Sequence, residues 1–98
     1  MSAIHADAAA VLAHARTLPG WQVHADVELR KTFECKDFAD GLTLVNQIGA
    51  LAELAQHHPD LLLRYHSVAV TLTTHDAGGL TARDLALAAA IDALEVRA

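Results

Sequence analysis

The spacing of hydrophobic residues along the chain predicts three helices. From Ser2 to about Thr17, apolar side chains recur at helical intervals, with Ser2 available as the N-cap. The stretch from Phe38 to Gln56 contains no proline and follows Asp37, a residue type that commonly caps helices. A last helix is expected from Thr81 through about Glu95.

Alternation of apolar and polar residues predicts four strands in two pairs. Residues 21–24 and 27–34 alternate with a period of two and join near Ala25-Asp26 as a hairpin. The apolar run 61–64 and the alternating run 68–73 form the second pair. The order α-β-β-α-β-β-α predicts an α+β fold, in which helices cover one face of a single four-stranded antiparallel sheet.

Two apolar stripes run along the predicted helix 38–56, whereas a helix that packs only on its own sheet needs about one. The first stripe consists of Phe38, Leu42, Val45 and Ala52. The second stripe consists of Leu44, Ile48, Leu51 and Ala55. The second stripe either binds another subunit or completes a broad intramolecular core, and both interpretations stay open.

Composition narrows the class of protein. A chain of 98 residues fits one domain, residues 1–98, and its hydrophobic fraction of 53% slightly exceeds the usual 45–50%. The net charge of −5 argues against nucleic-acid binding, which requires clustered lysine and arginine. The single cysteine, Cys35, has no partner for an intramolecular disulfide, and we interpret it as a small buried hydrophobic residue. With no signal peptide or membrane-spanning run, the sequence predicts a cytoplasmic protein.

Three histidines are the candidates for chemistry. His57 and His58 precede Pro59, which should end the long helix, and His75 follows the best predicted strand. Because the ordinary pKa of histidine lies close to neutrality, a pair of imidazoles can supply an acid and a base. Three histidines can also hold a zinc ion, but no His-Glu-x-x-His pattern or cysteine pair accompanies them, so we expect no metal.

Two acidic residues are candidate supports for these histidines. Glu53 lies one helical turn before His57 and either orients that imidazole or is solvated. Asp84 is the third residue after Thr81, the spacing of a capping box, which indicates a structural role beside any functional one. The four other histidines are expected at the surface or at strand edges; they are His5, His14, His24 and His66.

The pattern Glu53, His57-His58-Pro59, Tyr65, His75 and Asp84 resembles the signature of the pterin-4a-carbinolamine dehydratases. Trp21, Phe33, Lys36-Asp37-Phe38 and the block THDAGGLTARD extend the resemblance to roughly residues 17–95. It implies a four-stranded antiparallel sheet backed by helices, and a small enzyme that dehydrates a 4a-hydroxytetrahydropterin without metal or organic cofactor. The family histidines fall on His57, His58 and His75, and its acidic position on Asp84.

The resemblance leads to a hypothesis for each residue. We expect His57 and His75 to share the acid and base roles from opposite sides of the pterin ring. His58, Asp84 and Glu53 are expected to bind the substrate. The resemblance also implies a homodimer or homotetramer, formed through the helix 38–56, and a link to an aromatic amino acid hydroxylase. The alternative is a dehydratase-like dimerisation or assembly-chaperone module without catalytic activity.

Overall fold

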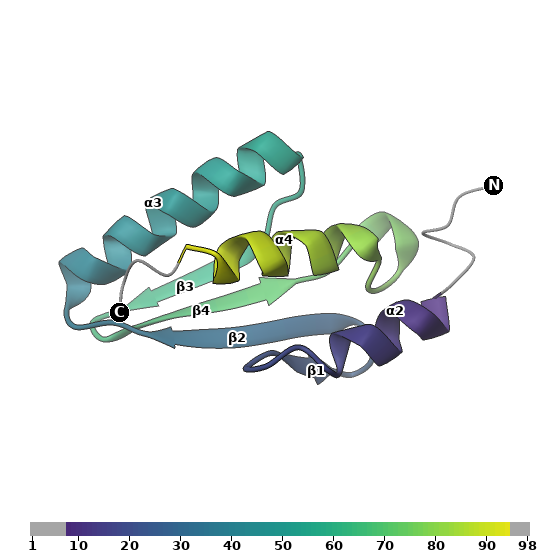
Figure 1. Cartoon of the computed structure of the whole chain (residues 1–98). Coiled ribbons are helices and arrows are strands. Elements are labelled where there is room, and N and C mark those ends of the chain that lie inside the picture. Colours follow the sequence, from purple (N-terminus) through teal and green to yellow (C-terminus); the bar gives the residue numbers. More distant parts are fainter. Residues whose placement is uncertain (1–7, 95–98) are drawn as a thin grey trace.

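The computed structural model describes residues 8–94, and its elements follow the predicted order (Figure 1). The helices are α2 (Ala8–Ala15), α3 (Phe38–Ala55) and α4 (Ala82–Asp92). The strands are β1 (Gln22–His24), β2 (Glu28–Glu34), β3 (Asp60–Arg64) and β4 (Ser67–Leu72), and a 3-10 turn, η1, covers His75–Ala77. The predicted cap Ser2, the residue His5 and the predicted end of the last helix, Glu95, lie outside the described residues.

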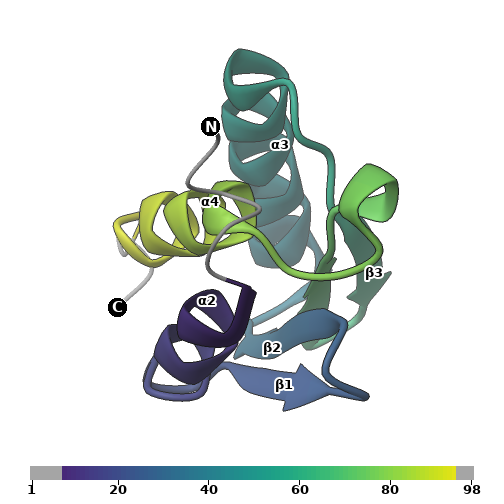
Figure 2. The ribbon, with the colours of Figure 1, turned by 90° about the vertical axis from the view of Figure 1, so that its right-hand side faces the viewer.

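The four strands form one antiparallel sheet in the order β1-β2-β4-β3. Its central pair is β2 and β4, which places Leu29 opposite Leu72 and Phe33 opposite Val68. The two hairpins therefore meet through their second strands. The three helices lie on one face of this sheet (Figure 2), which confirms the predicted α+β architecture.

The first hairpin turns at the predicted dipeptide. Ala25 and Asp26 both have positive φ angles, of 52° and 61°. Two successive residues in this conformation match the right-handed twist of the flanking strands, as in the tight turns that favour hairpins. Asp26 also accepts a hydrogen bond from the Arg16 guanidinium at 2.6 Å, which links the turn to the segment after α2.

Helix α3 packs on the sheet through the stripe that we had considered for a second subunit. Leu44 and Ile48 are almost completely buried, and they lie in the core with strands β2 and β4. Ala52, assigned to the first stripe, is also buried, whereas Phe38 and Leu42 of that stripe are about half exposed. Leu44 and Ile48 of the second stripe thus complete the intramolecular core, whereas Leu51 is half-buried and Ala55 is exposed.

Close approach of α3 to the sheet depends on a glycine. A Cβ atom placed on Gly41 would lie 2.7 Å from Cδ1 of Leu63 in β3 and 3.6 Å from Sγ of Cys35. Cys35 is 7% exposed, which confirms that it is buried. The missing side chain at position 41 therefore lets the first turn of the helix lie directly against the strand.

Helix α4 is attached to the sheet near its C-terminal end. The carboxylate of Asp92 accepts a hydrogen bond from Nε1 of Trp21 at 2.9 Å and forms an ion pair with Nζ of Lys31 at 2.8 Å. The same Lys31 Nζ lies 4.8 Å from the ring centre of Phe33. These contacts hold one end of α4, so that its first turn faces the end of α3. Within residues 8–94, none of the helices combines the length and apolar character that a membrane crossing requires.

Candidate active site

The candidate site lies where three segments come together: the end of α3, the end of β4 and the start of α4 (Figure 1). Helix α3 ends at Ala55, one residue earlier than predicted, because Gln56 adopts the left-handed conformation with φ of 51°. This C-cap turns the chain, and Pro59 follows before β3 begins. His57 and His58 therefore lie on the bend between helix and strand.

His57 points inward at this bend. Its residue is 8% exposed, and its Nε2 lies 2.6 Å from Oδ1 of Asp84, which is completely buried in the first turn of α4. The backbone N–H of His57 also donates to the carbonyl of Ala52, which continues the hydrogen bonding of α3 past its cap. The imidazole is thus held from two directions.

Asp84 accepts three hydrogen bonds, one of them from His57. Its second oxygen, Oδ2, accepts the hydroxyl of Thr74 at 2.7 Å and the backbone N–H of Thr81 at 3.0 Å. Thr81 caps α4, and together with Asp84 it forms the predicted capping box. The structural role proposed for Asp84 is therefore confirmed, and the same carboxylate contacts a candidate catalytic histidine.

His58 turns outward and contacts Glu53. Its Nε2 lies 2.5 Å from Oε2 of that carboxylate, and both side chains are more than half exposed. Of the two roles considered for Glu53, orienting His57 is wrong, and the carboxylate is largely solvated, as the alternative predicted. The left-handed Gln56 moves His57 out of the helical register, so the acid one turn earlier meets the next imidazole instead. An exposed pair of this kind contributes little to stability.

The three predicted histidines line one cavity of about 310 Å³. Its volume lies at the lower limit of typical small-ligand pockets. His75 is the first residue of η1, shortly after β4. Its side chain is exposed and lines the cavity. The remaining lining residues are Gln56, Thr73, Thr74, Asp76 and Arg83. Asp84 and Glu53 are absent from this lining, and each contacts one of the histidines.

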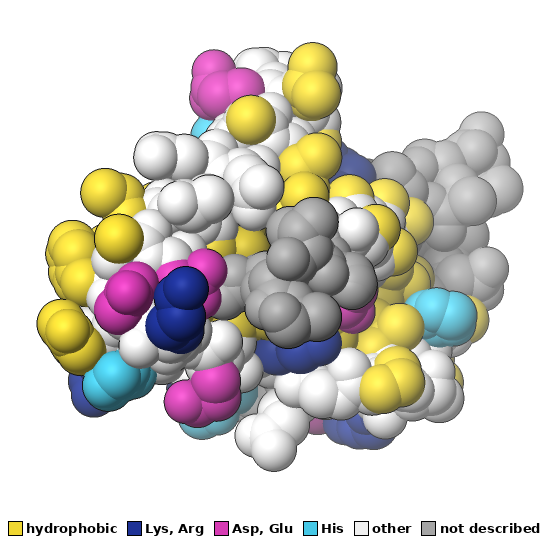
Figure 3. Space-filling model, turned by 60° about the vertical axis from the view of Figure 1, so that its left-hand side comes forward, with side chains coloured by type: hydrophobic (Ala, Val, Ile, Leu, Met, Phe, Trp, Pro, Cys, Tyr) yellow, Lys and Arg dark blue, Asp and Glu magenta, His cyan; other side chains and the backbone are white. Residues whose placement is uncertain are grey.

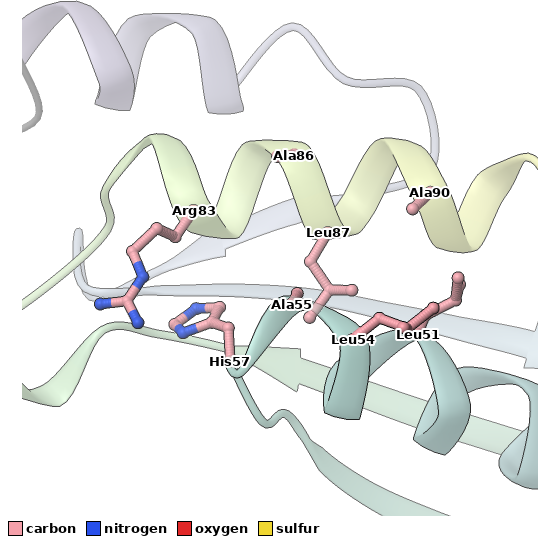
Figure 4. Close-up of a pocket in the computed structure, with 8 residues that line it drawn as sticks. All are labelled: Leu51, Leu54, Ala55, His57, Arg83, Ala86, Leu87 and Ala90. Atoms are coloured by element: carbon pink, nitrogen blue, oxygen red, sulfur yellow. The ribbon is translucent and has the colours of Figure 1, made fainter.

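Arg83 is a lining residue that the sequence analysis did not select. Its Nη2 lies 3.4 Å from the carbonyl oxygen of Gln56, so the side chain reaches from α4 to the end of α3. Figure 4 shows its guanidinium beside the ring of His57. Beyond its place beside Asp84 no sequence signal pointed to it, because neighbouring residues of a helix do not share a face. It brings a permanent positive charge to the cavity.

A second cavity of about 420 Å³ lies on the other side of His57 and Arg83. Both residues line it as well, and the rest of its wall is apolar (Figure 4). That wall consists of Leu51, Leu54, Ala55, Ala86, Leu87 and Ala90, from α3 and α4. The histidine cavity thus has a polar wall, while its neighbour between the helices is hydrophobic.

The structure also bears on the four histidines predicted at the surface and on the possibility of a metal site. His14, His24 and His66 are exposed, as predicted. Among residues 8–94, no group of three or more His, Cys, Asp or Glu side chains has an arrangement that could hold a metal ion. Two of the three cavity histidines instead have carboxylate partners, which suits proton transfer and binding.

The chain matches known proteins over most of its length. The sequence profile of the family described as Pterin 4 alpha carbinolamine dehydratase matches residues 4–94. A protein of Chloroflexus aggregans, named for pterin-4-alpha-carbinolamine dehydratase, is 45% identical over 84 residues, which are 86% of this chain and 89% of the relative. One of the same name from Acidobacterium capsulatum is 49% identical over 78 residues, which are 80% of this chain and 84% of the relative.

Two solved structures share the fold. A transcriptional coactivator/pterin dehydratase from Brucella melitensis is 34% identical, with a TM-score of 0.77 over 84% of this chain and 89% of that chain. A pterin dehydratase-like protein identified as a RuBisCO assembly factor in the alpha-carboxysome is 25% identical, with a TM-score of 0.66 over 81% of this chain and 93% of that chain. On sequence and fold together, this chain belongs to the pterin 4 alpha carbinolamine dehydratase family of hydro-lyases.

Proposed function

We propose that this protein dehydrates a 4a-hydroxytetrahydropterin to the quinonoid dihydropterin and water. One observation carries the proposal: in a chain of this family, three imidazoles from two distant segments line a single cavity. Such an arrangement offers proton donors and acceptors around a flat ligand. A reaction of the hydroxylase class, which leaves oxygen on the 4a carbon, would supply the substrate.

The proposed chemistry is a balanced loss of water. The bond between C4a and the hydroxyl oxygen breaks, the adjacent bond between N5 and C4a becomes double, and N5 loses its proton. A general acid delivers a proton to the leaving hydroxyl, and a general base accepts the proton from N5. No atom changes its overall oxidation level, so the step requires no redox partner.

The histidines divide these tasks in our proposal. His57 and His75 come from different segments that both border the cavity, and they exchange protons with the substrate from its two sides. His58 binds and polarises the pterin, and the Glu53 carboxylate at 2.5 Å orients its ring. Asp84 acts in the same way on His57. The binding roles first assigned to Glu53 and Asp84 are thus exercised through the two imidazoles.

A direct assay tests the activity. The purified protein should dehydrate chemically or enzymatically generated 4a-hydroxytetrahydropterin faster than the spontaneous reaction, in proportion to the protein concentration. Absorbance at the quinonoid product band, measured in a stopped-flow instrument, follows the rate. A matched control is His24→Ala, which removes an exposed histidine of β1 outside the cavity lining and should leave the rate unchanged. A wild-type rate equal to the background would contradict the proposal.

A second candidate function is a binding module without catalytic activity. It is favoured by the similarity to the pterin dehydratase-like RuBisCO assembly factor, with its TM-score of 0.66. Scaffolds released from catalysis have no need for a histidine cluster, and here His57, His58 and His75 still meet in one cavity. We therefore favour the enzyme. Binding of a pterin without any acceleration of its dehydration would favour the module.

We also propose that helix α3 joins two or more copies of the chain. Its outer side exposes Phe38 at 46%, Leu42 at 45% and Leu54 at 85% of their surfaces. One face of the molecule carries several surface hydrophobic side chains, as Figure 3 shows. Several large apolar side chains exposed on one helix are typical of interaction sites in soluble proteins.

The subunit interface has its own test. In the variant Leu42→Glu/Leu54→Glu, the two added charges would have to be buried, so the molar mass from light scattering should fall to that of a smaller assembly. Ala13→Glu, which adds a charge to the exposed side of α2, is the control and should keep the wild-type mass. A wild-type protein that is already monomeric at the same concentration would refute the interface.

A further inference from the structure

Two threonine hydroxyls lie behind His57, and their effect on its imidazole has not been considered so far. Thr74, at the end of β4, and Thr81, the cap of α4, are 5% and 2% exposed. Their hydroxyl oxygens lie 2.9 Å apart. The Thr74 oxygen also lies 2.7 Å from Oδ2 of Asp84, whose other oxygen contacts His57. The four side chains thus form one buried, connected series.

The direction of each hydrogen bond in this series can be derived from its fixed donors. The backbone N–H groups of Arg83 and Thr81 can only donate, to the Thr81 hydroxyl at 3.2 Å and to Oδ2 of Asp84 at 3.0 Å. An ionised carboxylate only accepts, so Thr74 must donate its single proton to Asp84. Thr81 must then donate to Thr74, since Thr74 has no second proton to give.

The same accounting determines which nitrogen of His57 carries a proton. Oδ2 of Asp84 accepts from the Thr74 hydroxyl and the Thr81 N–H, and Oδ1 accepts from Nε2 of His57 at 2.6 Å. Nε2 must therefore carry the ring proton. Among residues 8–94, no hydrogen-bond partner contacts Nδ1 of His57. This nitrogen is therefore the one available to a ligand in the cavity that His57 lines.

We propose that Thr74 and Thr81 are positioning residues that act through Asp84 to hold a proton on Nε2 of His57, leaving Nδ1 to exchange a proton with the substrate. The catalytic half of this statement rests on the proposed function, whereas the position of the proton does not. Two hydroxyls that polarise one another strengthen the series beyond a single contact. Without the Thr74 hydroxyl, Oδ2 would lose one of the two donors that fix the orientation of the carboxylate, so Oδ1 would be free to turn away from Nε2 of His57.

Thr74 offers the cleaner substitution of the two. Its backbone N–H and carbonyl both bond to Gly79, at 3.0 and 3.3 Å, so the loop stays attached when only the side chain changes. Valine has nearly the shape of threonine but no hydroxyl, while serine keeps the hydroxyl. Replacing Thr81 instead would also remove the cap of α4 and confuse helix stability with the position of the proton.

The experiment combines ring-nitrogen NMR with kinetics. In protein labelled with ¹⁵N-histidine, and at a pH where the rings are neutral, the signals of His57 should show Nε2 protonated and Nδ1 bare. They are assigned by their absence from the His57→Gln spectrum. In Thr74→Val, the population with the proton on Nδ1 should rise, and kcat should fall about tenfold with little change in KM. Thr74→Ser should restore the NMR pattern and the rate.

The outcomes separate this inference from the proposed function. Thr17→Val is the control, because it removes an exposed hydroxyl that bonds to the His14 carbonyl, far from the cavity. The inference is overturned if wild-type His57 carries its proton on Nδ1, or if Thr74→Val and Thr74→Ser give the same NMR pattern. A protein without dehydratase activity in which the Nε2 proton still depends on Thr74 would refute the function and support the positioning role.

Discussion

Replacing His57 or His75 by alanine is expected to lower kcat by about 10²–10⁴-fold each, the usual contribution of one acid or base group. The expectation follows from their position, since both side chains line the cavity and come from different segments. With both imidazoles removed, proton transfer would depend on water, so the double variant should approach the spontaneous rate. Stopped-flow dehydration of 4a-hydroxytetrahydropterin measures all three proteins.

The two single variants need different controls. His57 is buried against Asp84, so its removal leaves a buried carboxylate without one donor and should also cost about 1–3 kcal/mol in the free energy of unfolding. His75 is exposed, and its removal carries no such cost, so its rate reports chemistry alone. Urea unfolding of each variant separates the two effects. A double variant that keeps a near-normal rate would contradict both catalytic assignments.

Much of the fold could be predicted because local signals agree with the final architecture. Pro59 and the left-handed Gln56 end α3 within one residue of the predicted position, and Ala25-Asp26 forms the predicted turn. Which hairpins pair, however, is not a local property. Three of the predicted strands alternate and the fourth is a short apolar run, and neither pattern identifies a partner strand, so these patterns alone do not select the β2–β4 pair at the centre of the sheet.

The stripes of α3 show a second limit of local patterns. Periodicity identified two apolar sides, but it did not tell which one faces the sheet. Gly41 decides this in the structure, because the side of the helix that lacks a side chain there can approach Leu63 closely. Gly41 is buried on the same side as Leu44 and Ile48, so a glycine one turn before the second stripe lies on the packed face of the helix.

The site was predictable in its histidines and not in their partners. A helix break before His57 and a strand end before His75 place both at changes of chain direction, and the structure brings them to one cavity. Thr74 and Thr81 gave no comparable signal, because threonine is common in strands and at helix caps for local reasons. Their contact depends on the distance between two elements, which no sequence spacing encodes.

Asp84→Asn should have the most informative large effect, because it keeps the shape of the side chain while replacing a charged acceptor oxygen by an NH₂ donor. The N–H of Thr81 and the hydroxyl of Thr74 would hold the amide oxygen in place of Oδ2. The NH₂ group would then face Nε2 of His57, which would have to accept, so the ring proton would move to Nδ1.

With its proton on Nδ1, the free ring of His57 would present the wrong protonation state to the substrate, and the corresponding exchange in a Ser-His-Asp triad lowers kcat by about 10⁴-fold. We expect a loss of about 10³–10⁴-fold here, together with the inverted pattern of ring-nitrogen signals. Asp92→Asn is the matched control, because Asp92 also accepts hydrogen bonds from two side chains, at the other end of α4. If Asp84→Asn keeps kcat within tenfold of wild type, the proton on Nε2 is not what makes His57 effective.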